Sequence, residues 1–238
     1  MLPMSTCLIC HKSFQSLISW HHIIAGVTEE PICQTCQHSL QKISSEVCTI
    51  CGRSFQSIPE NHKHGALCYD CVRWQQDNRW KDVLTKNRSV YVYNNFIKDA
   101  ISLYKFRGDH VVAQAFKKDF QLAFRNYFGA SYTIIPIPLS SERLYERGFN
   151  QARALAELLN LPITEALSRI HLEKQSKKSR TERIHTENVF KLLAPSAIIN
   201  KPVLLIDDIY TTGSTLRHAA ELILNANAQS VSSFTLAR

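Results

Sequence analysis

A short run of apolar residues, VLLI at 203–206, is followed at once by two acids, Asp207 and Asp208. Four consecutive apolar residues are typical of a strand buried on both faces of a parallel sheet, and ligands of such sheets gather at the carboxyl ends of the strands. Residues 216–226 then place apolar side chains at helical spacing. The connecting residues 210–215, YTTGST, are rich in hydroxyls and contain one glycine. The pattern predicts a strand, a loop and a helix N-terminus whose N–H groups and dipole can bind a phosphate.

Periodic apolar positions predict further strands and helices from residue 90 onward. A strand at 132–137 is interrupted by Pro136 and followed by Pro138, so we expect it to leave the sheet there. Because strands and helices alternate, the predicted fold class is α/β, a mostly parallel sheet with helices on both faces. The other expected strands span 90–93, 189–193 and 231–236, the last at an edge of the sheet, and the other expected helices span 94–106 and 110–127.

Cysteines occur only before residue 72, as four Cys-x-x-Cys pairs. Two such pairs joined by a loop can place four thiolates tetrahedrally around one Zn²⁺, so we expect two zinc sites. Sequential pairing is the simplest arrangement, and a cross-braced arrangement is the alternative. A disulfide framework is disfavoured, because no secretion signal is visible and the long remainder of the chain has no cysteine. The pairs are Cys7 with Cys10, Cys33 with Cys36, Cys48 with Cys51, and Cys68 with Cys71.

The expected metals have a structural role. A site with four cysteine ligands leaves no open coordination position, and its metal can supply folding energy to a small module. Gly52 directly follows Cys51 and can adopt the positive φ that a zinc knuckle requires. In the first half of the module, His11 follows Cys10 instead.

Length and composition indicate two domains and a cytoplasmic location. The 238 residues, 45% of them hydrophobic, are enough for a double zinc ribbon at 1–75 and an α/β domain at 76–238. The chain has no run of about 18 apolar residues and no secretion signal, so we expect a cytoplasmic protein without membrane insertion. A formal net charge of +8 favours anionic partners such as nucleotides, pyrophosphate or nucleic acid.

A second strand, loop and helix pattern covers residues 134–159. Its loop carries Arg143, Arg147 and Gly148. The planar fork of arginine suits phosphate oxygens, so two fixed cations beside a glycine are expected to bind pyrophosphate. The alternative is a pair of solvated arginines at the start of a helix, although cations in that position oppose the helix dipole.

Residues 203–215 resemble the binding signature for phosphoribosyl pyrophosphate (PRPP) in type I phosphoribosyltransferases. The resemblance implies that PRPP binds together with Mg²⁺, that Asp207 and Asp208 hold the ribose hydroxyls, and that the loop at Arg143 and Arg147 binds pyrophosphate. A structural strand followed by solvated acids and an ordinary helix cap would explain each feature separately, but not their order. The residues implied to wrap the 5′-phosphate are Thr211, Thr212, Gly213, Ser214 and Thr215.

Residues 105–109, KFRGD, and 147–151, RGFNQ, resemble the ComF family of competence proteins. That family joins a cysteine-rich zinc module to a phosphoribosyltransferase-like domain, so the resemblance covers nearly the whole chain. It implies a role in DNA uptake during natural transformation, with single-stranded DNA, the competence helicase and other uptake proteins as partners. Residues 171–188, which are charged and lack glycine, resemble the mobile flap of phosphoribosyltransferases, although a solvated loop without a ligand is the alternative.

Aromatic and basic residues alternate just after the last cysteine pair. Such a surface can stack the bases of single-stranded DNA and contact its phosphates. We favour the alternative that two tryptophans at a domain junction pack the domains together. The residues concerned are Arg73, Trp74, Arg79, Trp80 and Lys81.

Two functions are compatible with these patterns. The first is Mg²⁺-dependent transfer of phosphoribose from PRPP with release of pyrophosphate, for which the sequence identifies no catalytic base and no acceptor. The second is a non-catalytic protein that handles single-stranded DNA and whose PRPP site is regulatory or vestigial. A purely structural zinc adaptor would leave the phosphate loop unexplained.

Overall fold

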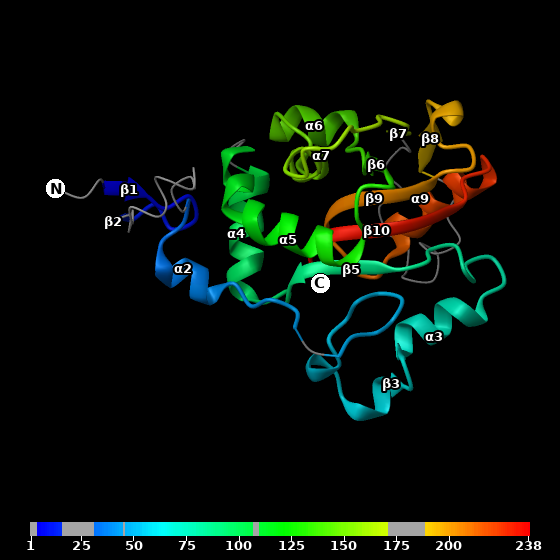
Figure 1. Ribbon diagram of the computed structural model, residues 1–238, viewed down its shortest axis with the longest axis horizontal. Helices are drawn as coiled ribbons and strands as arrows, with labels where there is room; N and C mark the ends of the chain where they lie inside the picture. Colours follow the sequence, from blue (N-terminus) through cyan, green and yellow to red (C-terminus); the bar gives the residue numbers. More distant parts are fainter. Residues whose placement is uncertain (1–3, 16–30, 45, 107–109, 171–188) are drawn as a thin grey trace.

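The centre of the protein is a parallel sheet with the strand order β5, β10, β9, β6 (Figure 1). This arrangement confirms the predicted α/β class. The strands are β5 (Asn87–Tyr91), β6 (Thr133–Pro136), β9 (Pro202–Ile209) and β10 (Ser230–Ala237). The structure is a computed structural model that describes residues 4–15, 31–44, 46–106, 110–170 and 189–238.

Helices cover both faces of the sheet, as the sequence predicts. Leu204 and Ile206 of β9 join a hydrophobic cluster formed with helices α4, α5 and α7. Val203 and Leu205 point the other way and pack in the cluster that contains α9. This alternation follows from the two-residue period of a strand. The helices are α4 (Asn95–Phe106), α5 (Lys117–Tyr127), α7 (Gln151–Glu157) and α9 (Ser214–Asn225).

Strand β10 lies inside the sheet, between β9 and β5, so its expected position at an edge was wrong. Its apolar residues alternate with serine and threonine, whose hydroxyls find partners on the neighbouring strand. Ser233 Oγ donates to Asn87 Oδ1 at 2.9 Å, and the hydroxyls of Thr235 and Ser89 lie 2.7 Å apart. Buried hydroxyls that are hydrogen-bonded in this way are compatible with a central strand.

Two other expected elements differ in the structure. Residues expected to begin one long helix form the 3₁₀ helix η3 (His110–Phe116), and α5 starts only at Lys117. The β-branched Val111 and Val112 weaken the α-helical preference of this segment. The strand expected at 189–193 is β8 (Phe190–Leu192), which pairs antiparallel with β7 (Leu167–Arg169) in a separate small sheet.

The cysteine-rich part contains two ribbons. The first ribbon, residues 4–15 and 31–44, contains β1 (Met4–Thr6), β2 (Ser13–Gln15) and α2 (Gln34–Ser39). The second ribbon, residues 46–76, is attached to the sheet through β5, where Asn87 Nδ2 donates to the carbonyl of Cys51 at 3.1 Å. Its elements are η1 (Phe55–Ser57), η2 (Glu60–His62), β3 (Lys63–His64), β4 (Leu67–Cys68) and α3 (Tyr69–Gln76).

We predict that Phe234→Ala destabilises the protein by about 3 to 5 kcal/mol, the usual cost of removing a buried aromatic ring. Phe234 is fully buried, and its ring centroid lies 4.3 Å from that of Phe120. Urea denaturation measures the change. Leu122→Ala on the exposed side of α5 is the control and should change stability by less than about 0.5 kcal/mol. Equal effects of the two substitutions would contradict the assignment of Phe234 to the core.

Candidate functional site

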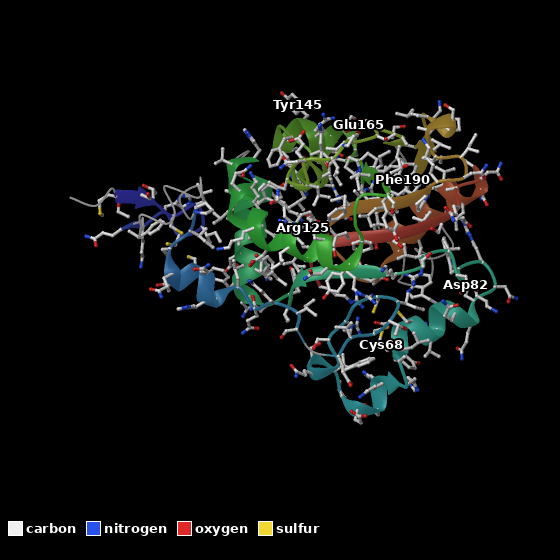
Figure 2. All side chains as sticks on the ribbon, viewed as in Figure 1. Cys68, Asp82, Arg125, Tyr145, Glu165 and Phe190 are labelled. Carbon is white, nitrogen blue, oxygen red and sulfur yellow. The ribbon has the colours of Figure 1, made fainter. Side chains whose placement is uncertain are left out.

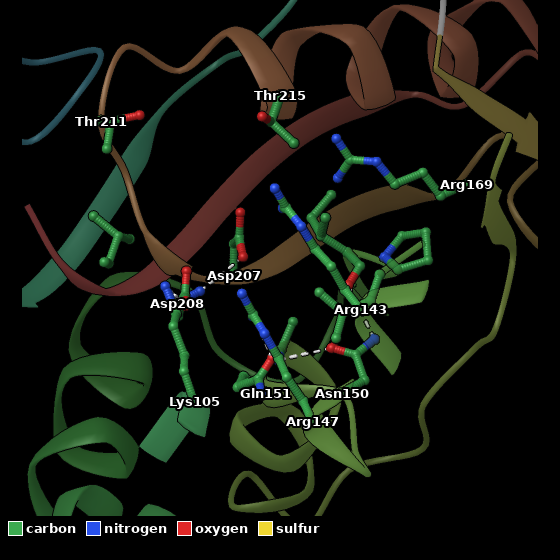
Figure 3. A pocket seen from close by; sticks show the side chains of 15 residues that line it. Lys105, Arg143, Arg147, Asn150, Gln151, Arg169, Asp207, Asp208, Thr211 and Thr215 are labelled. Atoms are coloured by element: carbon green, nitrogen blue, oxygen red, sulfur yellow. Dashed lines mark hydrogen bonds and ion pairs between the residues drawn. The ribbon is translucent and has the colours of Figure 1, made fainter. Parts of the chain in front are cut away.

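A pocket of about 220 Å³ lies at the carboxyl ends of β9 and β6 (Figure 3). It forms where β6 leaves the sheet. Pro136 is the last residue of β6 paired with β9, whereas β9 continues to Ile209 along β10. The strand therefore ends at the prolines, as the sequence predicts. The polar side chains that line the pocket are Lys105, Arg143, Arg147, Asn150, Gln151, Arg169, Asp207, Asp208, Thr211 and Thr215.

Asp207 and Asp208 form the acidic side of the pocket. Asp208 makes an ion pair with Lys105, which comes from the last turn of α4. The backbone N–H of Asp208 donates to Asp207 Oδ1 at 2.9 Å. Burial, together with the neighbouring Asp208 charge, raises the pKa of Asp207 to about 8, although Lys105 and Arg169 act in the opposite direction. Asp207 therefore holds its proton to a higher pH than an ordinary aspartate does.

Three arginines also line the pocket (Figure 3). Arg143 and Arg147 come from α6 (Ser141–Arg147), and Arg169 comes from β7. Burial lowers the pKa of Arg169, and the nearby charge of Arg143 adds to the effect. Because these cations repel one another, an anion placed between them would be stabilised. The sequence analysis did not find Arg169, since nothing in its local pattern shows that β7 folds back beside α6.

Capping residues fix α6 and α7 at the edge of the pocket. Ser140 accepts a hydrogen bond from the N–H of Arg143 at 3.3 Å, and α6 ends at Gly148 with φ 76°. Asn150 caps α7 and also donates to the carbonyl of Ile137 at 3.0 Å, which ties the helix to the end of β6. Gly148 therefore serves the turn, and it is not among the residues that line the pocket.

Gln151 is buried below the arginines. Its Oε1 accepts a hydrogen bond from Arg147 at 2.9 Å, which orients that guanidinium. Its Nε2 has no hydrogen-bond partner within the described structure, although the residue is only 2% exposed. A buried amide N–H without a partner costs free energy, so an acceptor on a bound ligand would be favoured there.

The loop between β9 and α9 makes a tight turn at its glycine. Gly213 has φ 79° and occupies the N-cap position of α9. A Cβ atom there would lie 2.1 Å from Tyr210 Oη, so a side chain would not fit. The hydroxyl residues Thr211 and Thr215 line the pocket, whereas Thr212, Gly213 and Ser214 lie in the same turn outside the lining set.

The eight cysteines form two clusters of four. Within each cluster the sulfurs lie within 4.8 Å of one another. A zinc site with Zn–S distances of about 2.3 Å has S–S edges of about 3.8 Å, close to the 3.6 Å between Cys10 and Cys33 and the 3.5 Å between Cys51 and Cys68. The residues present therefore fit zinc. The grouping is sequential, so the cross-braced alternative was wrong: Cys7, Cys10, Cys33 and Cys36 form one cluster, and Cys48, Cys51, Cys68 and Cys71 the other.

The two clusters use the same turn with different residues. The N–H of Gly52 donates to the carbonyl of Cys48, and the N–H of His11 donates to that of Cys7, both at 2.9 Å. Gly52 has φ 70°, as expected, and a Cβ atom there would lie 2.8 Å from the Asn87 carbonyl oxygen. His11 adopts φ 58°. Glycine is thus required only in the second ribbon, where β5 packs against the turn.

The tryptophans after the last cysteine pair are packing residues. Trp74 is 8% exposed and Trp80 is 1% exposed, and both pack with α9. Their buried rings are not accessible to bases, which contradicts the stacking interpretation for these two residues. Arg79 pairs with Glu221 of α9 at 2.6 Å. Arg73 and Lys81 remain exposed.

Two further expectations concern other parts of the chain. The charged segment expected to form a flap, 171–188, lies outside the described residues. Among the helices that the structure describes, none has the length and apolar character needed to cross a membrane.

The fold and the pocket define a class of protein. A parallel sheet with two acids at the end of β9 and a tight hydroxyl loop before α9 is accompanied by a sequence match of residues 144–238 to the family described as phosphoribosyl transferase domain. The carboxy-terminal part of the molecule is thus a phosphoribosyltransferase-like domain, preceded by two tetracysteine clusters.

Relatives with established names identify the family. The chain is 43% identical to Competence protein ComFC of Bacillus subtilis over 234 residues, which cover 98% of this chain and 94% of the relative. It is 30% identical to Competence protein ComFC of Streptococcus pneumoniae over 233 residues, with 98% and 99% covered. DNA utilization protein YhgH of Escherichia coli (strain K12) is 25% identical over 233 residues, with 89% and 99% covered. The chain belongs to the ComFC family of competence proteins.

We predict a pH-dependent effect of Asp207→Asn on stability. Between about pH 4 and pH 8 the folded protein keeps a proton on Asp207 that the unfolded chain releases, because burial raises the pKa to about 8. This group therefore makes the free energy of unfolding fall as pH rises through that window. Denaturation at pH 6.0 and pH 8.5 should show the variant more stable relative to the parent protein at the higher pH. Parallel pH profiles of the two proteins would contradict the raised pKa.

Proposed function

We propose that the protein binds PRPP with Mg²⁺ in the pocket at the end of β9 and acts in DNA uptake during natural transformation. The observation that carries the proposal is that acidic, basic and hydroxyl side chains line one pocket. Asp207 and Asp208 lie at the end of β9, Thr211 and Thr215 belong to the loop that follows, and the three arginines Arg143, Arg147 and Arg169 line the same pocket (Figure 3). PRPP has the matching order of groups: a phosphate, a ribose diol and a pyrophosphate.

Each of the three sets of groups in the pocket suits one part of this ligand. Carboxylates of Asp207 and Asp208 accept hydrogen bonds from ribose hydroxyls. The N–H groups of the loop and the hydroxyls of Thr211 and Thr215 donate to the 5′-phosphate. The arginines neutralise pyrophosphate oxygens, which planar guanidinium groups bind well. Mg²⁺ bound with PRPP would supply further positive charge on the pyrophosphate.

The enzymatic form of the proposal is transfer of phosphoribose to a nucleophile with release of pyrophosphate. Positive charge develops on the sugar in such a reaction, and the carboxylates of Asp207 and Asp208 would stabilise it once Asp207, whose pKa is about 8 in the free protein, has lost its proton. Arg143, Arg147 and Arg169 would stabilise the leaving group. Release of pyrophosphate that depends on an added acceptor would indicate an enzyme. Without such turnover the protein would be a binding protein whose PRPP site is regulatory or vestigial.

A second candidate function is handling of single-stranded DNA, favoured by an aromatic cluster on the second ribbon. Tyr69 is 46% exposed, and the rings of His62 and His64 lie 5.7 Å and 6.0 Å from it. The guanidinium of Arg73 lies 5.9 Å from the same ring. Exposed aromatic rings beside a cation can stack bases and bind phosphates, which the buried Trp74 cannot. Relatives named competence and DNA utilization proteins agree with a DNA ligand.

These functions place the protein in the cytoplasm, where PRPP is made and where reducing conditions keep cysteines available for zinc. There it would receive incoming single-stranded DNA together with the competence helicase and other uptake proteins. The formal net charge of +8 favours binding of both anionic ligands, PRPP and single-stranded DNA.

We predict that, measured above pH 8 where Asp207 is ionised, Asp207→Asn and Asp208→Asn each weaken PRPP binding at least about tenfold, because each replaces a carboxylate acceptor for a ribose hydroxyl with a neutral amide. Arg169→Ala should weaken binding similarly. Isothermal titration with PRPP and Mg²⁺ measures the dissociation constants. The matched controls are Asp99→Asn on α4 and Arg125→Ala on α5, both exposed and outside the pocket. Unchanged affinity of the pocket variants would remove the assignment of this site to PRPP.

We predict that Tyr69→Ala weakens binding of single-stranded DNA by about 1 to 3 kcal/mol, the usual contribution of one stacked base. Fluorescence anisotropy of a labelled oligonucleotide at fixed salt measures the effect. Tyr69→Phe keeps the ring and should retain affinity. Tyr145→Ala is the control, because Tyr145 is 92% exposed and extends from α6, far along the chain from the cluster (Figure 2). Equal losses in Tyr69→Ala and Tyr145→Ala would show that Tyr69 has no specific role.

A further inference from the structure

The loop that precedes α9 is held from one side by the second ribbon and by Arg238. Trp74 belongs to α3, the helix that also contains Cys71, and its Nε1–H donates to the carbonyl of Thr212 at 3.2 Å. Arg238 Nη1 donates to the carbonyls of Tyr210 at 3.2 Å and Thr211 at 3.1 Å. Three consecutive carbonyls of the loop are therefore fixed.

The same arginine reaches a ligand of the second cysteine cluster. Arg238 Nη2 lies 3.0 Å from Cys51 Sγ. Hydrogen bonds to a ligand sulfur orient the ligand and tune its metal, so Arg238 has the position of an outer partner of the metal site. One guanidinium thus joins a cysteine of the cluster to two carbonyls of the loop.

Fixing the carbonyls also orients the amides that would bind phosphate. In a trans peptide unit the C=O and the following N–H point in opposite directions. The N–H groups of Thr211, Thr212 and Gly213 therefore point away from Arg238 and Trp74. Donors aimed together in this way form an anion-binding turn.

Buried contacts behind the loop reinforce this arrangement. Arg217 is 1% exposed, its guanidinium lies 4.4 Å from the Trp74 ring centroid, and its Nη1 donates to Tyr210 Oη at 2.8 Å. Tyr210 in turn leaves no space for a Cβ at Gly213. The ribbon, the loop and the start of α9 are packed in one hydrophobic cluster.

The two cysteine clusters differ in this respect. Cys48, Cys51, Cys68 and Cys71 are packed in the same hydrophobic cluster as Tyr210. Cys7 and Cys36 are packed in the other cluster, with α4 and α5. A metal ion at the second cluster would therefore be held by cysteines that pack against the loop, whereas the cysteines of the first cluster pack elsewhere.

We propose that Arg238 and Trp74 are positioning residues that couple metal occupancy of the second cysteine cluster to the conformation of the phosphate-binding loop. Removing the metal frees Cys51 from its fixed position, and Arg238 then loses one of its three acceptors. The loop carbonyls become less constrained, and the amides of residues 211–213 lose their common direction. The consequence for PRPP rests on the proposed function, whereas the effect on the loop itself does not.

Hydrogen exchange measured by mass spectrometry on the full, zinc-loaded chain tests this coupling without a ligand. Removal of zinc with a chelator should speed exchange of the peptide covering residues 210–215 roughly fivefold or more, the factor for losing one hydrogen bond. Arg238→Ala should produce a similar increase while both zinc ions stay bound. Zinc removal from Arg238→Ala should then add less than it does in the parent protein, because only the connection through Trp74 remains.

Further variants separate positioning from general damage. Trp74→Phe keeps the ring but loses the donor to Thr212, so it should also speed exchange of the loop. Arg238→Lys keeps the charge but lacks the planar fork, and it should fall between the parent protein and Arg238→Ala. Arg125→Ala is the matched control and should leave loop exchange unchanged. Loop exchange that is unaffected by both zinc removal and Arg238→Ala would overturn the proposal.

Titration with PRPP and Mg²⁺ then extends the test to the ligand. The dissociation constant for PRPP should rise roughly fivefold in Arg238→Ala. Bound PRPP should raise the zinc affinity of the second cluster by the same factor by which zinc raises the PRPP affinity, because coupling between two ligands is reciprocal. Absence of PRPP binding by the parent protein would contradict the proposed function, while the exchange experiment would still decide the coupling. PRPP binding of normal affinity in Arg238→Ala with a fast-exchanging loop would overturn the role of the loop in binding.

Discussion

Burial of β9 on both faces of the parallel sheet is the constraint on which the site depends. Its four apolar residues are fixed between two helical layers, so the next residues must emerge at one defined edge of the sheet. The neighbouring strand β6 leaves at Pro136, which opens a pocket beside Asp207. A strand free to slip in register could not place the two acids there, since a shift of one residue would turn every side chain of β9 to the other face of the sheet.

Acidic and basic side chains share the pocket, and only some of their charges are compensated by a partner within the protein. Lys105 compensates Asp208, but Asp207 keeps a raised pKa, and Arg169 keeps a lowered one next to Arg143. Burying acids and arginines whose charges are incompletely compensated costs free energy. A ligand with both hydroxyl donors and negatively charged groups would reduce that cost. A phosphorylated sugar with a metal-bound pyrophosphate would be such a ligand.

Much of this arrangement is visible in the sequence, because it arises from local patterns. The apolar run, the two acids and the loop glycine predict the strand end and the turn, and cysteine spacing predicts two metal clusters. Contacts between distant segments are not visible in this way. The place of β10 inside the sheet depends on Asn87 and Ser89 of another strand. Arg169 enters the pocket only because β7 pairs with β8, and Arg238 reaches Cys51 across 187 positions of the chain.

The central claim is that one pocket holds all three parts of PRPP. A crystal structure of the zinc-loaded protein with PRPP and Mg²⁺ tests it most directly. We expect the 5′-phosphate at the loop of residues 211–215, the ribose hydroxyls at Asp207 and Asp208, and the pyrophosphate beside Arg143, Arg147 and Arg169. Density for PRPP elsewhere on the protein, or an empty pocket at saturating ligand, would contradict the account.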